Sequence, residues 1–162
     1  MHTVVSDTGP LIALAKVDRL YLLEHMFGEV LIPTAVYREL LAKPGVEAGY
    51  LDRAYRDFLK VVPVSQISPE VDFVTLRLDQ GEREAVALAY EHRALLILDE
   101  RLGRLAARRL ELRVTGVVGV LIQAKSSGLL DAVSPLLETI RQRGYWLSDD
   151  VLDAAARLSG EM

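Results

Sequence analysis

Residues 3–16 read TVVSDTGPLIALAK, and this stretch sets the pattern for the whole chain. The apolar run at residues 3–6 predicts a short strand, and Pro10 suits the first position of a helix that continues to about residue 16. A single carboxylate, Asp7, stands between them. Asp7 can be the N-cap of this helix, or it can be a ligand of a metal site, and residues elsewhere in the sequence distinguish between these two roles.

The composition narrows the classes of protein to which the chain can belong. Its 162 residues suit one domain, and 51% apolar residues are enough to build a proper core. The absence of cysteine excludes disulfides and thiolate metal sites. Asp7 interrupts the first apolar run and no basic segment precedes it, so we expect no signal peptide. No apolar stretch approaches roughly 20 residues, so we expect a cytoplasmic protein with no membrane contact. The net charge of −4 leaves nucleic-acid binding to a local patch.

Short β-rich runs alternate with helical stretches along residues 1–116. We expect strands at residues 3–6, 30–32, 61–64, 95–98 and 113–115, and helices at 10–16, 19–27, 34–42, 51–59, 81–92 and 101–110. Asp18 and Thr34 are the expected caps of the second and third helices, which end at Gly28 and before Pro44. Pro63 places the third strand at an edge of the sheet.

This alternation predicts an α/β fold with a parallel sheet of about five strands flanked by helices. Residues 1–162 form a single domain in this interpretation, with an α/β core at 1–116 and a helical C-terminal extension at 117–162. Within the extension, new helices are expected to start at Ser134 and Ser148.

Two aspartates follow strands of the predicted sheet. Asp7 comes after the first strand, and Asp99 comes after the fourth. Ligands of such sheets bind beyond the carboxyl ends of the strands, so both carboxylates are expected at the same edge. Each also has a simpler alternative as the cap of the helix that follows it.

Three glutamates are candidates for the same edge. Glu39 projects within the apolar face of its helix, although it can also be a surface residue on a poorly covered edge. Glu82 points toward the core, but Asp79-x-x-Glu82 also resembles a capping box. Glu84 lies about 200° around the same helix, so at most one of the pair can reach the site, and a solvated position is the simpler explanation for Glu84.

Clustered carboxylates repel each other unless a cation neutralises them. Oxygen ligands without cysteine or histidine favour Mg²⁺ or Mn²⁺ over zinc, and such an ion commonly serves phosphate chemistry. The three histidines are expected at the surface, away from these strand ends. We therefore prefer one metal site over four unrelated caps and surface residues, with the ligands Asp7, Glu39, Glu82 and Asp99.

The helix after Asp99 carries a stripe of arginines at positions i, i+3 and i+7, namely Arg101, Arg104 and Arg108. An ordinary solvated helix face is the simpler explanation, and their place beside Asp99 makes phosphate binding the alternative. No aromatic residues interleave with them in the way that stacks single-stranded bases.

The order of these motifs resembles a known family. The resemblance is carried by the segments VVSDTGPLIALAKV, FGEVLIPTAVYREL, LDQGEREAVALAYEH and LLILDERLGRLAARRL. Together they resemble the PIN (PilT N-terminus) domain, and more narrowly its VapC-like branch, found as toxins beside small antitoxins in bacteria and archaea. The resemblance implies a doubly wound α/β sheet and a Mg²⁺- or Mn²⁺-dependent ribonuclease. The family's acids fall on Asp7, Glu39, Glu82 and Asp99, with Glu84 as the alternative third acid.

Two positions depart from the family pattern. Gly9 stands where many PIN domains have Ser, Thr or Asn, so a group that would orient Asp7 or a metal-bound water is missing. Ser6 or Thr8 can take over that role, and Thr115 is a further expected supporting residue. The third acid is Glu instead of the commoner Asp. Both departures favour weak activity or its loss.

The sequence as a whole predicts a metal-dependent endoribonuclease that hydrolyses RNA phosphodiesters as the toxin of a toxin–antitoxin pair. RNA is then the substrate, a small antitoxin is the partner, and a homodimer is the expected assembly. The alternative is a catalytically silent PIN-fold interaction module. A phosphohydrolase for small phosphate esters is less favoured, because the chain lacks DxDxT and Walker motifs.

Overall fold

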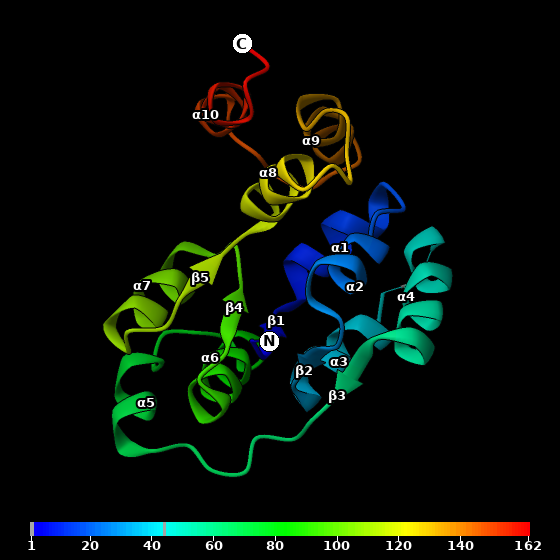
Figure 1. The fold of residues 1–162 in the computed structure, drawn as a ribbon. Coiled ribbons are helices and arrows are strands. Elements are labelled where there is room, and N and C mark those ends of the chain that lie inside the picture. Colours follow the sequence, from blue (N-terminus) through cyan, green and yellow to red (C-terminus); the bar gives the residue numbers. More distant parts are fainter. Residues whose placement is uncertain (1, 44) are drawn as a thin grey trace.

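The computed structural model of the chain describes residues 2–43 and 45–162, so the helix stop expected at Pro44 lies outside them. Five strands form one parallel sheet in the order β3-β2-β1-β4-β5 (Figure 1). The strands are β1 (Val4–Ser6), β2 (Val30–Ile32), β3 (Leu59–Val61), β4 (Leu95–Ile97) and β5 (Val114–Thr115). The prediction of a single α/β domain with about five parallel strands is confirmed.

Helices connect the strands and follow the last one. They are α1 (Thr8–Lys16), α2 (Tyr21–Phe27), α3 (Thr34–Leu41), α4 (Val46–Asp57), α5 (Pro69–Val74), α6 (Gln80–His92), α7 (Arg101–Arg109), α8 (Val117–Ser126), α9 (Ser134–Gln142) and α10 (Asp149–Ser159). Within residues 2–43 and 45–162, no helix combines the length and the apolar character needed to cross a lipid bilayer.

Helices cover both faces of the sheet, as Figure 1 shows. On one face, Val4 and Ile97 are buried in a core shared with α1, α2 and α8. On the other face, Val5 and Leu96 are buried in a second core with α6 and α7. Successive strand residues point to opposite faces, so a strand covered on both sides must be apolar throughout. This explains why β1 and β4 have nearly continuous apolar sequences.

The order of the strands reverses between β1 and β4. From β1 the chain proceeds outward to β2 and β3, and later it returns to the other side of β1 to add β4 and β5. The backbone N–H of Asp7 donates to the carbonyl of Ile97 at 2.9 Å, which extends the pairing of β1 and β4 by one residue. Such a reversal opens a crevice at the carboxyl ends of the two strands, where open α/β sheets bind ligands.

The three C-terminal helices belong to the same body as the sheet. Leu121 of α8 and Leu137 of α9 are fully buried in the core that also contains Leu14 of α1. The helix starts expected at Ser134 and Ser148 are confirmed, and Oγ of Ser148 accepts the backbone N–H of Val151 at 3.1 Å. Residues 117–162 therefore share one hydrophobic core with the α/β part.

The third strand lies two residues earlier than predicted, although its place at the sheet edge is confirmed. The last backbone hydrogen bond of this edge runs from the N–H of Val62 to the carbonyl of Ile32, at 2.9 Å. Pro63 follows and has no N–H to donate, so it ends the pairing instead of lying inside the strand. The preceding helix, expected at residues 51–59, spans Val46–Asp57, and the short helix α5 was not predicted.

Asp18 does not cap the second helix. It adopts a left-handed conformation with φ of 51° and closes the end of α1. Its N–H donates to the carbonyl of Ala15 at 3.1 Å, and the N–H of Arg19 donates to the carbonyl of Leu14 at 2.9 Å. This is the Schellman pattern, which needs a short residue at the left-handed position. The stop at Gly28 is confirmed, with φ of 74°.

The cap of α3 comes from another helix. Thr34 is the first residue of α3 and its side chain makes no cap hydrogen bond. Instead, Oε1 of Glu84, on α6, accepts the backbone N–H of Ala35 at 3.0 Å. Nε2 of Gln80 donates to the other carboxylate oxygen of Glu84 at 2.6 Å. A solvated Glu84 is therefore the wrong interpretation, because this side chain joins the start of α3 to α6.

We expect Glu84→Ala to lower the free energy of unfolding by about 1 kcal/mol, the usual cost of removing a helix cap. Urea unfolding followed by circular dichroism measures this difference. Glu24→Ala, at an exposed position on α2, is the matched control and should change the stability by less than about 0.5 kcal/mol. Equal stability of the two variants would show that the contact between Glu84 and Ala35 contributes nothing.

Candidate functional site

Asp7 is buried at the carboxyl end of β1, beside the crevice between β1 and β4. It occupies the N-cap position of α1, yet its side chain makes no cap hydrogen bond. Only 7% of the residue is exposed, and within the described part of the chain Oδ1 has no hydrogen-bond partner. Burying an unpaired carboxylate oxygen is costly, so the capping interpretation does not explain this residue.

Other acidic side chains surround Asp7. Burial raises its pKa to about 7, although the backbone N–H of Thr8 opposes the change. The negative charges of Glu39, Asp79 and Asp99 raise it further. The predicted acids Asp7, Glu39 and Asp99 thus share one electrostatic environment, and a bound cation would relieve their repulsion.

Asp99 differs from Asp7 because both of its oxygens have partners. The backbone N–H of Val117, at the start of α8, donates to Oδ1 at 3.1 Å, and the hydroxyl of Tyr145 donates to Oδ2 at 2.5 Å. Burial raises the pKa of Asp99, while these two donors and the charge of Arg104 oppose that rise. Asp99 does not cap α7, because Glu100 does so.

Two glycines make room for two of the carboxylates. A Cβ atom at Gly81 would overlap Oε1 of Glu39, so Glu39 lies directly against the first turn of α6. A Cβ atom at Gly116 would overlap Oδ1 of Asp99 and would lie 3.1 Å from Nη1 of Arg104. Any larger residue at either position would displace a carboxylate from the site.

Glu82 forms the capping box that its spacing from Asp79 predicts. The backbone N–H of Glu82 donates to Oδ1 of Asp79 at 2.9 Å, and the backbone N–H of Asp79 donates to Oε1 of Glu82 at 3.1 Å. Burial raises the pKa of Glu82 to about 7, opposed by the Asp79 N–H, and the charges of Asp79, Glu100 and Asp7 raise it further. Glu82 therefore caps α6 and also belongs to the acidic environment around Asp7, whereas Glu84 caps the start of α3.

The acids are neighbours but do not form a closed set of ligands. Within residues 2–43 and 45–162, no three Asp, Glu, Cys or His side chains converge closely enough to hold one ion. The donor chemistry nevertheless fits a hard divalent cation. Oδ1 of Asp7 is buried without a hydrogen-bond partner among the described residues, and the charges of Glu39, Asp79 and Asp99, which raise the pKa of Asp7, are all negative. Closing this site around an ion requires a long side chain, that of Glu39 or Glu82, to move.

The expected supporting residues have different surroundings. Oγ of Ser6 donates to the backbone carbonyl of Asp7 at 3.0 Å and so supports the backbone at the end of β1. Oγ1 of Thr8 is buried and has no partner among the described residues. Thr115 packs against α8, where a Cβ atom at Gly119 would overlap its hydroxyl.

The arginine stripe is only partly at the site. Arg104 is half-buried, and its guanidinium borders Gly116 together with the Asp99 carboxylate. Arg101 and Arg108 are exposed on the same helix. One arginine therefore lies at the acidic site, and two lie on the surface of α7.

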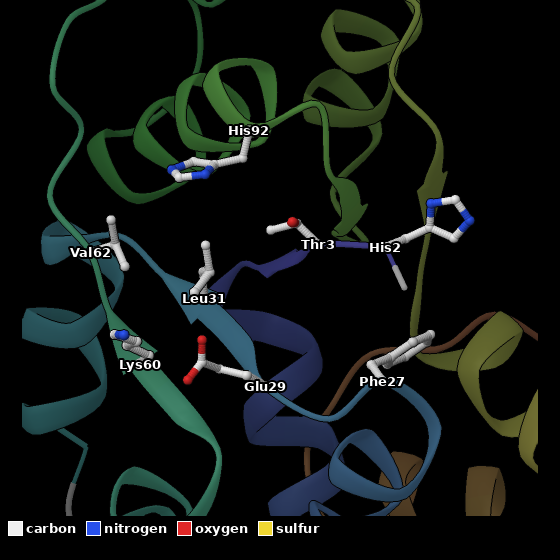
Figure 2. A pocket seen from close by; sticks show the side chains of 8 residues that line it. All are labelled: His2, Thr3, Phe27, Glu29, Leu31, Lys60, Val62 and His92. Atoms are coloured by element: carbon white, nitrogen blue, oxygen red, sulfur yellow. The ribbon is translucent and has the colours of Figure 1, made fainter.

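The opposite edge of the sheet has a hollow of its own, with a volume of about 390 Å³. Figure 2 shows His2 and His92 on different sides of this hollow, with Glu29 and Lys60 below. All three histidines of the chain are exposed, as expected. Neither imidazole is near the acidic site, so histidine takes no part in it.

Three residues of this environment were not predicted as part of the site. Asp79 and Glu100 are acidic neighbours of Glu82, and their positions next to predicted residues were an available signal. Tyr145 was not detectable, because it lies 46 residues after Asp99 in a region predicted only as helical. Only the packing of the C-terminal helices brings it to the sheet.

We expect the metal-free protein to lose stability as the pH rises from about 4 to about 7. Asp7 binds its proton more tightly in the folded protein, where its pKa is about 7, than in the unfolded chain, where it is near 3.8. Between pH 5 and pH 8 this corresponds to about 2–3 kcal/mol. Asp7→Asn should remove that part of the pH dependence in urea unfolding with EDTA. Asp153→Asn, at an exposed position, should leave it unchanged, and an unaltered pH dependence in Asp7→Asn would contradict the prediction.

Comparison with known proteins supports the same family that the motif order suggested. A family model described as PIN domain matches residues 3–161, which is nearly the whole chain. No curated protein matches the chain. A match of this extent, on a five-stranded parallel sheet with acidic residues at its carboxyl edge, leads to one assignment. The chain belongs to the PIN-domain family.

Proposed function

We propose that this protein is a Mg²⁺- or Mn²⁺-dependent endoribonuclease that hydrolyses RNA phosphodiesters. PIN domains are generally nucleases that use divalent metals, and this supports the reaction class. The observation that carries the proposal is the buried carboxylate oxygen of Asp7 at the strand reversal, which has no hydrogen-bond partner within residues 2–43 and 45–162 and whose acidic neighbours are Glu39, Asp79 and Asp99.

The residues that would hold the ion are Asp7 and Asp99, with Glu39 and Glu82 contributing directly or through water. When bound, such an ion lowers the pKa of a water and stabilises charge on a phosphodiester. Asp7 holds a proton with a pKa of about 7 in the metal-free protein, so metal binding has to displace that proton. Metal binding should therefore weaken as the pH falls below about 7.

The positive charge beside the acids favours a phosphate-containing substrate. Arg104 lies against Asp99 and can bind the phosphate next to the reacting one, while Arg101 and Arg108 extend the positive charge along α7. Phosphate contacts of this kind fix the position of a nucleic acid without reading its sequence. The chain's net charge of −4 makes this local stripe the more important for RNA binding.

We also propose that the protein is the toxin of a toxin–antitoxin pair, that it forms a homodimer and that it acts in the cytoplasm. The motif order supports the toxin assignment. Exposed apolar side chains on α5, α7 and the turn after α5 support a protein partner, because a surface of this kind is usually covered in an assembly. These side chains are Phe73, Leu76, Leu102 and Leu105, with exposed fractions of 72%, 66%, 44% and 43%.

A catalytically silent interaction module is the second candidate function. It is favoured by the capping box, which occupies Oε1 of Glu82, and by the failure of three acids to converge within the described residues. Gly9, which stands where many PIN domains have Ser, Thr or Asn, also favours the silent module. The two candidates differ in one property, since only the nuclease needs a bound metal ion.

We expect Mn²⁺ to raise the melting temperature of the wild-type protein and to support cleavage of RNA. Asp7→Asn and Glu82→Gln should each abolish cleavage, and Asp7→Asn should also remove most of the metal-dependent stabilisation, since stabilisation requires binding to the folded state. Differential scanning fluorimetry and a gel assay with a fluorescent RNA measure the two effects.

Glu84→Gln is the matched control for Glu82→Gln, because it makes the same chemical change two residues along the same helix. It should cleave RNA within a few-fold of wild type. A wild-type protein that ignores Mn²⁺ and leaves RNA intact would favour the silent module. If Glu84→Gln is inactive and Glu82→Gln is active, the third acid has to be reassigned.

We expect the double variant Arg104→Gln/Arg108→Gln to bind RNA more weakly and with a smaller salt dependence. The slope of log affinity against log salt should decrease by about 1.4, since each single-strand phosphate contact contributes about 0.7. Fluorescence anisotropy over a range of salt concentrations measures the slope. Arg56→Gln/Arg157→Gln removes the same charge from exposed positions on α4 and α10 and should leave the slope unchanged. Equal slopes for the two double variants would show that Arg104 and Arg108 belong to an ordinary solvated helix face and do not bind RNA phosphates.

A further inference from the structure

We infer that Tyr145 is a positioning residue of the active site, whose hydroxyl orients the Asp99 carboxylate, and that Gly9 is the small residue that admits it. This inference rests on the proposed metal-dependent cleavage and adds a residue to it. Tyr145 lies between α9 and α10, far from the acids in sequence, and no sequence motif marks it.

The contact between Tyr145 and Asp99 fixes one oxygen of the carboxylate. The Tyr145 hydroxyl donates to Oδ2 at 2.5 Å, and the backbone N–H of Val117 donates to Oδ1 at 3.1 Å. The same Val117 N–H also lies 3.4 Å from Oδ2, so it is shared between the two oxygens. Rotation of the carboxylate about its Cβ–Cγ bond would weaken these hydrogen bonds, and Oδ1, with this single donor, keeps a lone pair for a ligand.

Asp7 provides the comparison within the same site. No donor holds its Oδ1 among the described residues, whereas both oxygens of Asp99 have a donor. The two aspartates therefore have different parts in the proposed centre: Asp99 is held in a fixed orientation, and Asp7 has a free oxygen. Groups that orient a metal-binding carboxylate through a hydrogen bond typically change metal affinity or activity 10–100-fold when they are removed.

The surroundings of Tyr145 keep its hydroxyl in place. Its ring packs against the core formed by α1, α8 and α9. Its backbone N–H donates to the carbonyl of Ile140 at 3.2 Å. Close by, Nζ of Lys16 donates to the carbonyl of Arg143 at 2.9 Å, and the Arg143 guanidinium donates to the carbonyl of Lys16. The loop that carries Tyr145 is thus tied to the end of α1, the helix that begins after Asp7.

Gly9 meets the same hydroxyl from the other side. A Cβ atom at Gly9 would lie 3.1 Å from the Tyr145 hydroxyl oxygen, and 3.7 Å and 3.9 Å from Cε1 and Cζ of the ring. The first distance is tighter than ordinary contact, and the other two are not. An alanine at position 9 would therefore press on the hydroxyl end of Tyr145. Because the oxygen is bonded rigidly to the ring, the side chain has to shift by a few tenths of an ångström, and the hydrogen bond to Asp99 is disturbed with it.

The test begins with Tyr145→Phe, which removes the hydroxyl and keeps the ring. We expect Mn²⁺ to bind about tenfold more weakly or worse, and RNA cleavage at saturating RNA to fall by a similar factor. Tyr90→Phe is the matched control, because the Tyr90 hydroxyl donates to a carboxylate oxygen of Glu70 at 3.1 Å on the surface. It should bind Mn²⁺ and cleave RNA like the wild type. Isothermal titration calorimetry measures the metal affinity.

Gly9→Ala tests the same hydroxyl without deleting it, and it remains informative if Tyr145→Phe folds poorly. We expect Gly9→Ala to weaken Mn²⁺ binding and cleavage in the wild-type background. In the Tyr145→Phe background it should have no further effect, because the atom it displaces is gone. A purely structural role for Tyr145 predicts something else: a lower melting temperature without metal, unchanged Mn²⁺ affinity, and independent effects of the two substitutions.

The outcomes separate this inference from the proposed function. If the wild type binds Mn²⁺ and cleaves RNA, and Tyr145→Phe and Gly9→Ala do both equally well, Tyr145 has no positioning role and the proposed function stands. If the wild type neither binds Mn²⁺ nor cleaves RNA, the proposed function fails and the inference fails with it. Weaker binding in both single variants, without further loss in the double variant, supports the inference.

Discussion

One carboxylate, with an oxygen that has no hydrogen-bond partner in the described part of the chain, is buried where the strand order of the sheet reverses. The backbone of Asp7 extends the pairing of β1 with β4, which fixes the position of this residue at the end of the strand, and only 7% of the residue is exposed. The surrounding elements accommodate this constraint. Glycine at positions 81 and 116 lets Glu39 and Asp99 approach, and the N-terminus of α8 and a tyrosine hydroxyl hold Asp99. Burying these carboxylates close together costs free energy in the metal-free protein, and a bound cation would offset that cost by neutralising their charge.

The layout of the fold was predictable from the sequence, because it depends on periodicity. Continuous apolar runs in β1 and β4 predicted strands buried on both faces, and their alternation with helices predicted a parallel sheet. The same reasoning placed Asp7 and Asp99 at one edge. Helix caps were less predictable, because different residues compete for the same helix end. Asp18 can cap the start of one helix or end another, and only the backbone conformation shows that it ends α1. Thr34 was predicted to cap α3, but the side chain of Glu84, on α6, accepts the backbone N–H of Ala35 instead.

The candidate site was predictable as a set of residue types and less so as a set of contacts. Glu82 illustrates the reason, since one spacing predicted both a capping box and a core-facing acid, and both descriptions apply to it. Long-range contacts had no signal at all. Tyr145 reaches Asp99 only because α8, α9 and α10 fold back onto α1, and the sequence around it does not differ from an ordinary turn between helices.

The dependence of Asp99 on Val117 and Tyr145 also has a consequence for protein synthesis. A ribosome makes the chain from the N-terminus, and all five strands, together with Asp7, Glu39 and Glu82, have been translated by residue 115, before the second donor to Asp99 is added at residue 145. Long-range contacts of this sort form late in folding. A nascent chain that ends before residue 145 can therefore have most of a sheet and still lack the oriented Asp99. In a nuclease, this order of assembly would delay RNA cleavage until residue 145 has been translated and the C-terminal helices have packed onto α1.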